Sequence, residues 1–340
     1  MKDNAQQIQQ MWKVCINCAT YNHSLYIENA MHGFCKQQTK FPFVAIIVDD
    51  ASTDGAQNVI RNYLQDFFIM EDSICSETED YLHLFARHRI NINCYFAVYL
   101  LKSNHYSINR SKSPYYNKYN NAKYIALCEG DDYWIVNDKL QRQVEFLESH
   151  NNYSMVYTAF QTVNQEGDII ERENYERMMQ RSRSGDILPM LLETNFILTC
   201  TTIFRRDIFD QPWYQGLSFA HDYTLFLTAS ICGYCAYFPE RMSAYRKNPN
   251  GAMATRRNMI NKMFNETKIW VYDGLCSGRI PIEKKRFTYQ IKKYIATVCI
   301  LQDNQAFKEQ YRNIVKQNRC LWIFIPLTLL KLLIVKYSHN

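Results

Sequence analysis

The chain has 340 residues, of which 47% are hydrophobic and 14% aromatic. This composition suffices for one large core with a smaller unit attached, and it excludes a chain that is mostly disordered. The net charge of +6 is unevenly spread: from Arg241 to Asn340, 19 Lys and Arg face 5 Asp and Glu, whereas residues 1–240 have a net charge of −8. We therefore predict an acidic body with a basic tail, and basic tails bind the phosphate groups of anionic lipids or nucleic acids.

The N-terminus and the cysteines indicate the compartment. The first ten residues, MKDNAQQIQQ, are polar, so we expect no secretory signal and predict that the twelve cysteines are reduced in the cytosol. Two C-x-x-C pairs, Cys15/Cys18 and Cys232/Cys235, have a spacing that could hold zinc. The first pair lies in a predicted strand, where residues three apart point to opposite faces, so we favour packed thiols.

The first part of the chain alternates strands and helices. Residues 13–18 predict a strand, and the apolar spacing from Ile27 to Phe34 predicts a helix. The unbroken apolar run at 43–48 predicts a parallel strand covered on both faces. A helix through Val59 and Phe67 follows, and we expect one of residues 52–54 to cap it.

Further along the chain the pattern is less regular. We predict that residues 71–121 are irregular, apart from a strand at 94–102. The other predicted elements are a strand at 124–128, a helix through Leu140, Val144 and Leu147, a strand at 155–160, a polar segment at 164–184, a strand at 200–204, a helix from Asp222 to Cys232, a strand at 234–240 and mostly helix from Asn258. This order predicts an α/β fold with a single mixed, mostly parallel sheet flanked by helices and a helical C-terminal extension.

We divide the chain into a catalytic body, residues 1–250, and a basic, mostly helical region, residues 251–340. Segment 321–335 is apolar except for Thr328 and Lys331. As a helix it would span about 22 Å, less than the roughly 30 Å of a bilayer core. Because basic residues flank it, we predict that it lies in the plane of a membrane surface. The alternative is a terminal helix packed on the body.

Carboxylates follow two predicted strands. Asp49 and Asp50 end the strand at 43–48, and Glu129, Asp131 and Asp132 follow the strand at 124–128. In open α/β sheets, ligands bind beyond the carboxyl ends of the strands. The ten glycines form neither a dinucleotide-binding fingerprint nor a P-loop. A divalent cation bound by carboxylates is the remaining way to hold a diphosphate, and we expect the intervening glycine to allow a sharp turn.

Five motifs in this order, TYN (20–22), IIVDDASTD (46–54), CEGDDYW (128–134), HD (221–222) and YR (245–246), resemble the family 2 glycosyltransferases over residues 12–250. The resemblance implies an A-type nucleotide-diphospho-sugar transferase fold and an inverting enzyme. It is greatest to bacterial enzymes that build surface polysaccharides. Such an enzyme would move a sugar, with UDP-sugars the expected donors, to a hydroxyl of a glycan or lipid-linked acceptor, with Mn²⁺ or Mg²⁺ as cofactor.

The resemblance also implies roles for individual residues. Asp222 would be the catalytic base, Glu129 and Asp131 would bind the metal, and Asp132 would lie near the sugar. The nucleotide-binding residues would be Tyr21, Asn22, Asp50 and Asp54. Contacts to the diphosphate or the acceptor would involve Arg246, His221, Asn195 and Thr199.

These interpretations place the protein in the cytoplasm, peripheral at the inner face of the cell membrane, with a nucleotide-sugar donor, a glycan or lipid-linked acceptor and the membrane surface as partners. No nucleic-acid-binding motif is present in the sequence, and the body is acidic, so we expect no nucleic-acid partner. Two alternatives stay open. One is a metal-dependent nucleotidyltransferase, although TYNHS (20–24) is a poor triphosphate loop. The other is a non-catalytic protein that binds nucleotide sugars or a membrane surface.

Overall fold

The structure is a computed structural model that describes residues 12–119, 121–215, 221–248 and 257–281. The predicted membrane-surface segment 321–335 lies outside these residues, as does most of the region 251–340. Within the described residues, no helix combines the length and the apolar content that crossing a membrane requires.

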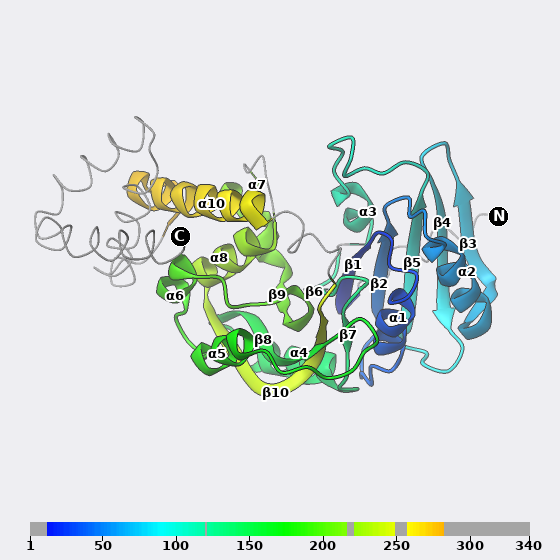
Figure 1. Ribbon diagram of the computed structural model, residues 1–340, viewed down its shortest axis with the longest axis horizontal. Helices are drawn as coiled ribbons and strands as arrows, with labels where there is room; N and C mark the ends of the chain where they lie inside the picture. Colours follow the sequence, from blue (N-terminus) through cyan, green and yellow to red (C-terminus); the bar gives the residue numbers. More distant parts are fainter. Residues whose placement is uncertain (1–11, 120, 216–220, 249–256, 282–340) are drawn as a thin grey trace, which may run out of the picture.

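One ten-stranded sheet runs through the molecule in the order β3-β4-β5-β2-β1-β6-β9-β8-β10-β7 (Figure 1). The strands are β1 (Val14–Thr20), β2 (Phe43–Asp49), β3 (Phe68–Glu77), β4 (Tyr81–His88), β5 (Cys94–Leu101), β6 (Tyr124–Leu127), β7 (Tyr133–Trp134), β8 (Tyr153–Val163), β9 (Ile203–Arg205) and β10 (Tyr234–Arg246).

The strand directions confirm the predicted mixed sheet. Its parallel pairs lie in the centre and between β8 and β10, and the other pairs are antiparallel. Parallel pairing joins β5, β2, β1 and β6 in the centre, and it also joins β8 to β10. The other neighbours run antiparallel, because the hairpin of β3 and β4 extends one edge and β9 runs opposite to both β6 and β8. The carboxyl ends of β1, β2 and β6 therefore lie at one edge of the sheet, which is where both acidic pairs were expected.

Helices cover both faces of this sheet. The helices are α1 (Ile27–Cys35), α2 (Ala56–Phe67), α3 (Ser113–Asn117), α4 (Lys139–Ser149), α5 (Glu173–Arg181), α6 (Leu188–Glu193), α7 (Pro212–Gln215), α8 (Asp222–Cys232) and α10 (Arg257–Ser277), with 3-10 turns η2 (Thr199–Thr201) and η3 (Arg206–Asp210). Helices α1, α2 and α4 share one core with the central strands. A second core lies on the opposite face with α3, and a third joins β8, α6 and α8 to α10, which packs along α8 (Figure 1).

The apolar patterns explain the elements that the sequence predicted. Every residue of β2 is buried, as expected of a parallel strand between two helical layers. Helix α8 has the predicted bounds, and β10 continues past the predicted end to Arg246. The prediction that Cys15 and Cys18 point to opposite faces of a strand is confirmed. The two residues belong to cores on opposite faces of β1, and both thiols are free.

Three regions differ from the predictions. The stretch at 71–88, expected to be irregular, lies in the β3–β4 hairpin, and α5 forms within the segment expected to be polar. The strand predicted at 200–204 is shorter, because residues 199–201 form a 3-10 turn before β9. Helix α2 begins after Gly55, which has a positive φ of 93°, and no side chain of residues 52–54 takes the N-cap position.

Candidate active site

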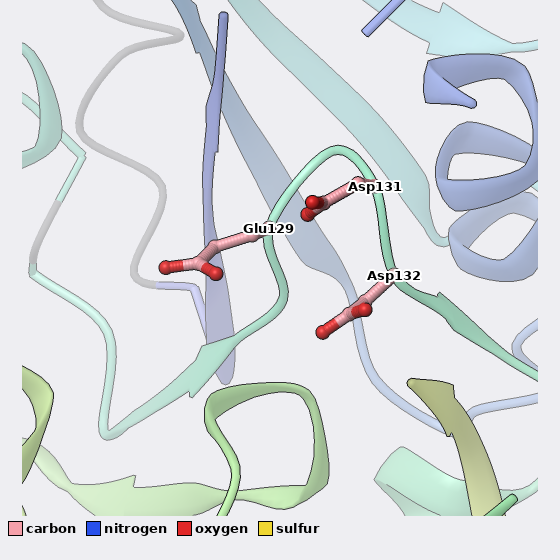
Figure 2. A group of neighbouring side chains, drawn as sticks. All are labelled: Glu129, Asp131 and Asp132. Atoms are coloured by element: carbon pink, nitrogen blue, oxygen red, sulfur yellow. The ribbon is translucent and has the colours of Figure 1, made fainter. Parts of the chain in front are cut away.

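The acidic loop between β6 and β7 brings three carboxylates together. Ligand atoms of Glu129, Asp131 and Asp132 all lie within 4.8 Å of one another. Figure 2 shows the three side chains leaving the loop toward the same side. Three like charges at this separation repel, so the cluster favours either protonation or a bound cation. Within the described residues, it is the one group of this kind that could hold a metal.

Gly130 is required by a close approach, which differs from the predicted reason. A Cβ atom at this position would lie 2.5 Å from Oγ1 and 2.7 Å from Cβ of Thr20, and 3.0 Å from Cδ1 of Ile27. The predicted turn is present, with the N–H of Asp132 donating to the carbonyl of Glu129 at 3.1 Å, but the residue has no positive φ, so the turn itself does not require glycine. Glycine lets the acidic loop pack directly against the carboxyl end of β1.

The Asp132 carboxylate has one internal donor. Asp132 is 1% exposed, and its Oδ1 accepts a hydrogen bond of 2.9 Å from the backbone N–H of Arg246. Within the described residues, its buried Oδ2 has no hydrogen-bond partner by geometry, although the thiol of Cys200, a weak donor, lies beside the carboxylate. Burial, followed by the negative charge of Asp131, raises the pKa of Asp132 well above its ordinary value.

Neighbouring negative charges also act on the carboxylate of Glu129. Solvent reaches its side chain, yet the surrounding protein desolvates the carboxylate, and this effect raises its pKa together with the charges of Asp131 and Asp222. Lys112 acts in the opposite direction. A divalent cation would remove this repulsion and supply a partner for the orphaned Oδ2 of Asp132, so the donor set of the acidic loop fits a hard cation such as Mn²⁺ or Mg²⁺.

His23 contacts the acidic loop, and the sequence did not predict it. Its Nε2 lies 3.6 Å from Oδ2 of Asp131, and its Nδ1 lies 3.2 Å from Oγ1 of Thr20. The ring thus joins the end of β1 to a candidate metal ligand. The sequence offers no periodic signal for this contact, because His23 lies in a polar loop far from Asp131 along the chain.

Asp49 and Asp50, the acidic pair at the end of β2, accept hydrogen bonds from other groups of the chain. Asp50 accepts hydrogen bonds from the backbone N–H groups of His105 and Tyr106 and pairs with Lys112. Asp49 bonds to Ser52 and to the side chain of Gln57. These carboxylates are therefore neutralised or solvated from within the fold.

The predicted nucleotide residues Asn22 and Asp54 connect two loops. The backbone N–H of Asn22 donates to Oγ of Ser52, and the Asn22 side-chain oxygen accepts from the N–H of Thr53. Asp54 accepts from the N–H groups of Ser24 and Ala56 at 2.8 and 3.0 Å. Burial opposes ionisation of Asp54, but these bonds outweigh it and lower the pKa of the carboxyl.

Tyr21 lies in the first of these loops, directly after β1. The side chain is 44% exposed, which makes it one of the large hydrophobic residues that the fold leaves open to solvent. Its ring is therefore available to stack on a ligand at the edge of the sheet.

Asp222 is the first residue of α8, and His221 takes the N-cap position without a side-chain cap bond. Asp222 is therefore not the N-cap of α8. Its carboxylate is 39% exposed and lies 3.6 Å from Nδ1 of His221, whose Nε2 bonds to Oγ1 of Thr267 on α10. The negative charge of Asp222 contributes to the raised pKa of Glu129, so the candidate base lies within electrostatic reach of the acidic loop.

Arg246 is 3% exposed, and its guanidinium is engaged within the fold. It donates to the backbone carbonyls of Asp131, Asn164 and Gln165 at 3.0, 3.1 and 2.6 Å. It also lies 4.7 Å from the ring centroid of Tyr26. These contacts fasten the end of β10 to the acidic loop, and a contact of Arg246 with diphosphate stays a prediction.

The two predicted acceptor-side residues lie on the segment that leads to β9. The Asn195 side chain accepts from the N–H of Ile197. Thr199 begins η2, and its carbonyl accepts from the hydroxyl of Thr202. Both side chains are partly exposed, so their roles toward a ligand stay predictions.

The fold is that of the A-type nucleotide-diphospho-sugar transferases. A mannosyltransferase from Pyrobaculum calidifontis, solved with GDP-Man and Mn²⁺, has the same fold, with a TM-score of 0.52 and 13% identity over 92% of this chain and 76% of that chain. The predicted fold class is thus confirmed.

Sequence comparison identifies the family. Residues 15–75 match the model described as Glycosyl transferase family 2. An uncharacterized protein of Mycobacterium tuberculosis is 29% identical over 68% of this chain, and the chain spans 58% of the length of that relative. TuaG of Bacillus subtilis, named as a teichuronic acid biosynthesis glycosyltransferase, is 24% identical over 74% of this chain and 86% of its own length. The resemblance to the family 2 glycosyltransferases that the sequence motifs predicted is thus confirmed over residues 15–75.

Proposed function

We propose that the protein is a metal-dependent, inverting glycosyltransferase that moves a sugar from a nucleoside diphosphate sugar, first of all a UDP-sugar, to a hydroxyl of a glycan or lipid-linked acceptor. The observation that supports this most directly is the acidic loop, in which three carboxylates lie within 4.8 Å of one another and within electrostatic reach of Asp222. The name of TuaG, a teichuronic acid biosynthesis glycosyltransferase, supports a role in the synthesis of a surface polysaccharide.

The acidic loop supplies the donor end of the proposed site. Glu129 and Asp131 would hold the cation, and Asp132, fixed by the Arg246 N–H, would face the sugar. When bound, Mn²⁺ or Mg²⁺ would neutralise the charge of the leaving diphosphate. Tyr21 would stack on the nucleotide base, and the bonds of Asn22 and Asp54 would hold the Tyr21 loop in place. This division of roles explains why one acidic loop needs a cation and the neighbouring loops do not.

Asp222 supplies the proton acceptor. In an inverting displacement, the acceptor hydroxyl attacks the anomeric carbon from the face opposite the leaving group, and a carboxylate takes its proton. The start of a helix favours the ionised form of Asp222, so it is ready to accept. His221 would orient this carboxylate, and Asn195 and Thr199 would contact the acceptor.

We also propose that the chain works at the inner face of the cell membrane, where lipid-linked acceptors reside. The support is the sequence of segment 321–335 and the basic residues around it. The two-part division at residue 250 belongs to the same proposal.

Donor hydrolysis and transfer with a panel of nucleotide sugars tests this function. We expect one donor to release its nucleoside diphosphate when Mn²⁺ or Mg²⁺ is present and none to do so in a chelator. Asp66→Asn, which changes an exposed residue of α2, should behave as wild type. The proposal fails if no donor in the panel binds or turns over under either condition.

A further inference from the structure

Helix α10 contributes a buried hydroxyl to the neighbourhood of the candidate base. Thr267 is fully buried, and its Oγ1 lies 2.9 Å from Nε2 of His221, the residue before Asp222. The two partners are 46 positions apart and meet because α10 packs along α8, which begins at Asp222 (Figure 1). Thr267 lies outside residues 15–75, which match the family model, and outside the predicted catalytic body. The contact is therefore a feature of this chain that the family match does not cover.

The hydrogen bonds of Thr267 indicate which nitrogen of His221 carries the proton. A threonine hydroxyl has one hydrogen to donate, and Thr267 donates it to the carbonyl of Met263, one turn earlier in α10, at 2.9 Å. A lone pair of Oγ1 then faces His221, so Nε2 is the nitrogen that donates. In a neutral ring whose Nε2 is protonated, Nδ1 is an acceptor. Thr267 thus favours one tautomer of His221.

Aromatic side chains hold the His221 ring in its plane. The ring stacks on Tyr223 at a centroid distance of 6.2 Å and an angle of 8°, and its centroid lies 5.6 Å from that of Phe264 on α10. In this orientation Nδ1 lies 3.6 Å from Oδ1 of Asp222. This distance exceeds that of a hydrogen bond, but catalytic hydrogen bonds are often long in a free enzyme and shorten when the substrates bind.

We propose that Thr267 is a positioning residue, which fixes the Nε2–H tautomer of His221 and so presents Nδ1 to the candidate base. This proposal rests on the proposed function. As the acceptor oxygen attacks the anomeric carbon, its O–H bond breaks and the proton moves to the carboxylate of Asp222. The new O–H of Asp222 then donates to Nδ1 of His221. The opposite tautomer would point an N–H at Asp222, which favours the ionised carboxylate and makes it a weaker base.

The ring nitrogens of His221 test the tautomer directly. Nitrogen NMR spectra of the full chain with labelled histidine distinguish a protonated from an unprotonated ring nitrogen, and His221→Gln assigns the signals. At about pH 8, where an ordinary histidine is neutral, we expect the proton of His221 on Nε2. Thr267→Val keeps the shape of the side chain and removes the hydroxyl, so we expect this preference to be lost in that variant.

The rate of transfer tests what the tautomer does. We expect Thr267→Val to lower kcat about tenfold, the effect of one lost buried hydrogen bond, and to change affinity for the nucleoside diphosphate less than about twofold. Thr267→Ser keeps the hydroxyl and should restore most of the rate.

Thr228→Val is the matched control. Thr228 is also a buried threonine, and its hydroxyl donates to the carbonyl of Thr224 at 2.9 Å within α8. It lies roughly 10 Å along the helix from His221, so its loss should change kcat less than about twofold.

A proton on Nδ1 of His221 in the wild type overturns the proposal, and so does an unchanged tautomer in Thr267→Val. Equal kcat values for wild type and Thr267→Val overturn it as well. If Thr267→Val does not fold, the wild-type spectrum still decides which nitrogen is protonated. If no donor is turned over, the proposed function has failed, whereas the spectra still show whether Thr267 fixes the tautomer.

Discussion

Two acidic clusters at the same edge of the sheet differ in the hydrogen-bond donors and cations that the chain places around their carboxylates. At the end of β2, the carboxylates of Asp49, Asp50 and Asp54 accept bonds from backbone N–H groups, from Gln57 and from Lys112. Burial raises the pKa of Asp49 in spite of its bonds. In the acidic loop after β6, the charges of neighbouring carboxylates add to burial and raise the pKa of Glu129 and Asp132. The first cluster takes its donors from the chain, whereas we propose that a cation completes the second.

This difference separates carboxylates that stabilise the fold from carboxylates that bind a ligand. A carboxylate whose donors come from its own chain stabilises the fold, and its loss costs stability. A carboxylate held close to like charges costs stability in the free protein and is retained for a ligand. The following variants sharpen or break that division.

Asp131→Ala should have the largest effect on activity. We expect donor turnover to fall by roughly a thousandfold or more, because the cation that neutralises the leaving group loses a ligand. Stability should stay within about 0.5 kcal/mol of wild type, since the change removes one of three repelling charges. Turnover assays and urea unfolding measure the two effects. A large loss of stability with turnover preserved would place Asp131 among the carboxylates that stabilise the fold.

Asp222→Asn should remove turnover and leave donor binding intact. Loss of a general base costs about a hundredfold to ten-thousandfold in rate. Affinity for the nucleoside diphosphate should change less than about threefold, because the proposed role of Asp222 is toward the acceptor hydroxyl. Calorimetric binding beside a transfer assay separates the two quantities. Equal losses in both would show that Asp222 supports the fold of the site instead of taking the proton.

Arg246→Met tests the link between the acidic loop and β10. The change removes the donor to three carbonyl groups, of which the Gln165 carbonyl lies 2.6 Å away, and we expect unfolding to become easier by about 3 kcal/mol. Arg241→Met is the matched control, because its pair with Glu176 is 44% and 38% exposed and contributes about 0.5 kcal/mol or less. Equal urea midpoints for the two variants would contradict the account of Arg246.

Asp54→Ala should have the smallest effect, which falls on stability. Loss of the bonds to Ser24 and Ala56 should cost about 1 kcal/mol. Because these bonds lower the pKa of Asp54, their contribution is present above its ordinary value of 3.8 and is lost as the pH falls below it. Urea unfolding at neutral and acidic pH checks this. A difference between variant and wild type that grows on acidification would be the wrong sign.

The sequence predicted the elements that are apolar and buried and missed those held by pairing. Strand β2 and helix α8 were found because both are mostly apolar in sequence and are buried along nearly their whole length. The β3–β4 hairpin was missed because residues 71–80 are rich in acids, and its strands form by pairing with each other and with β5. Helix α5 was missed because none of its residues is fully buried.

The sequence predicted the three carboxylates of the acidic loop and missed the residues that contact them from other parts of the chain. Glu129, Asp131 and Asp132 follow a strand end, which a sequence can show. Thr20 and His23 support the acidic loop from β1, and Lys112 pairs with Asp50 across 62 positions of sequence. Spacing along one chain has no signal for such contacts, and for this reason the turn at Gly130 was predicted while its close approach to Thr20 was missed.

Binding of Mn²⁺ by the full chain, followed by electron paramagnetic resonance with and without UDP, tests the central claim most directly. We predict one site in the wild type whose affinity rises when UDP is present, the same site in Asp54→Ala, and its loss in Asp131→Ala. Equal Mn²⁺ binding by wild type and Asp131→Ala, or no Mn²⁺ site in the presence of UDP, would contradict the claim that the acidic loop holds a metal and a diphosphate together.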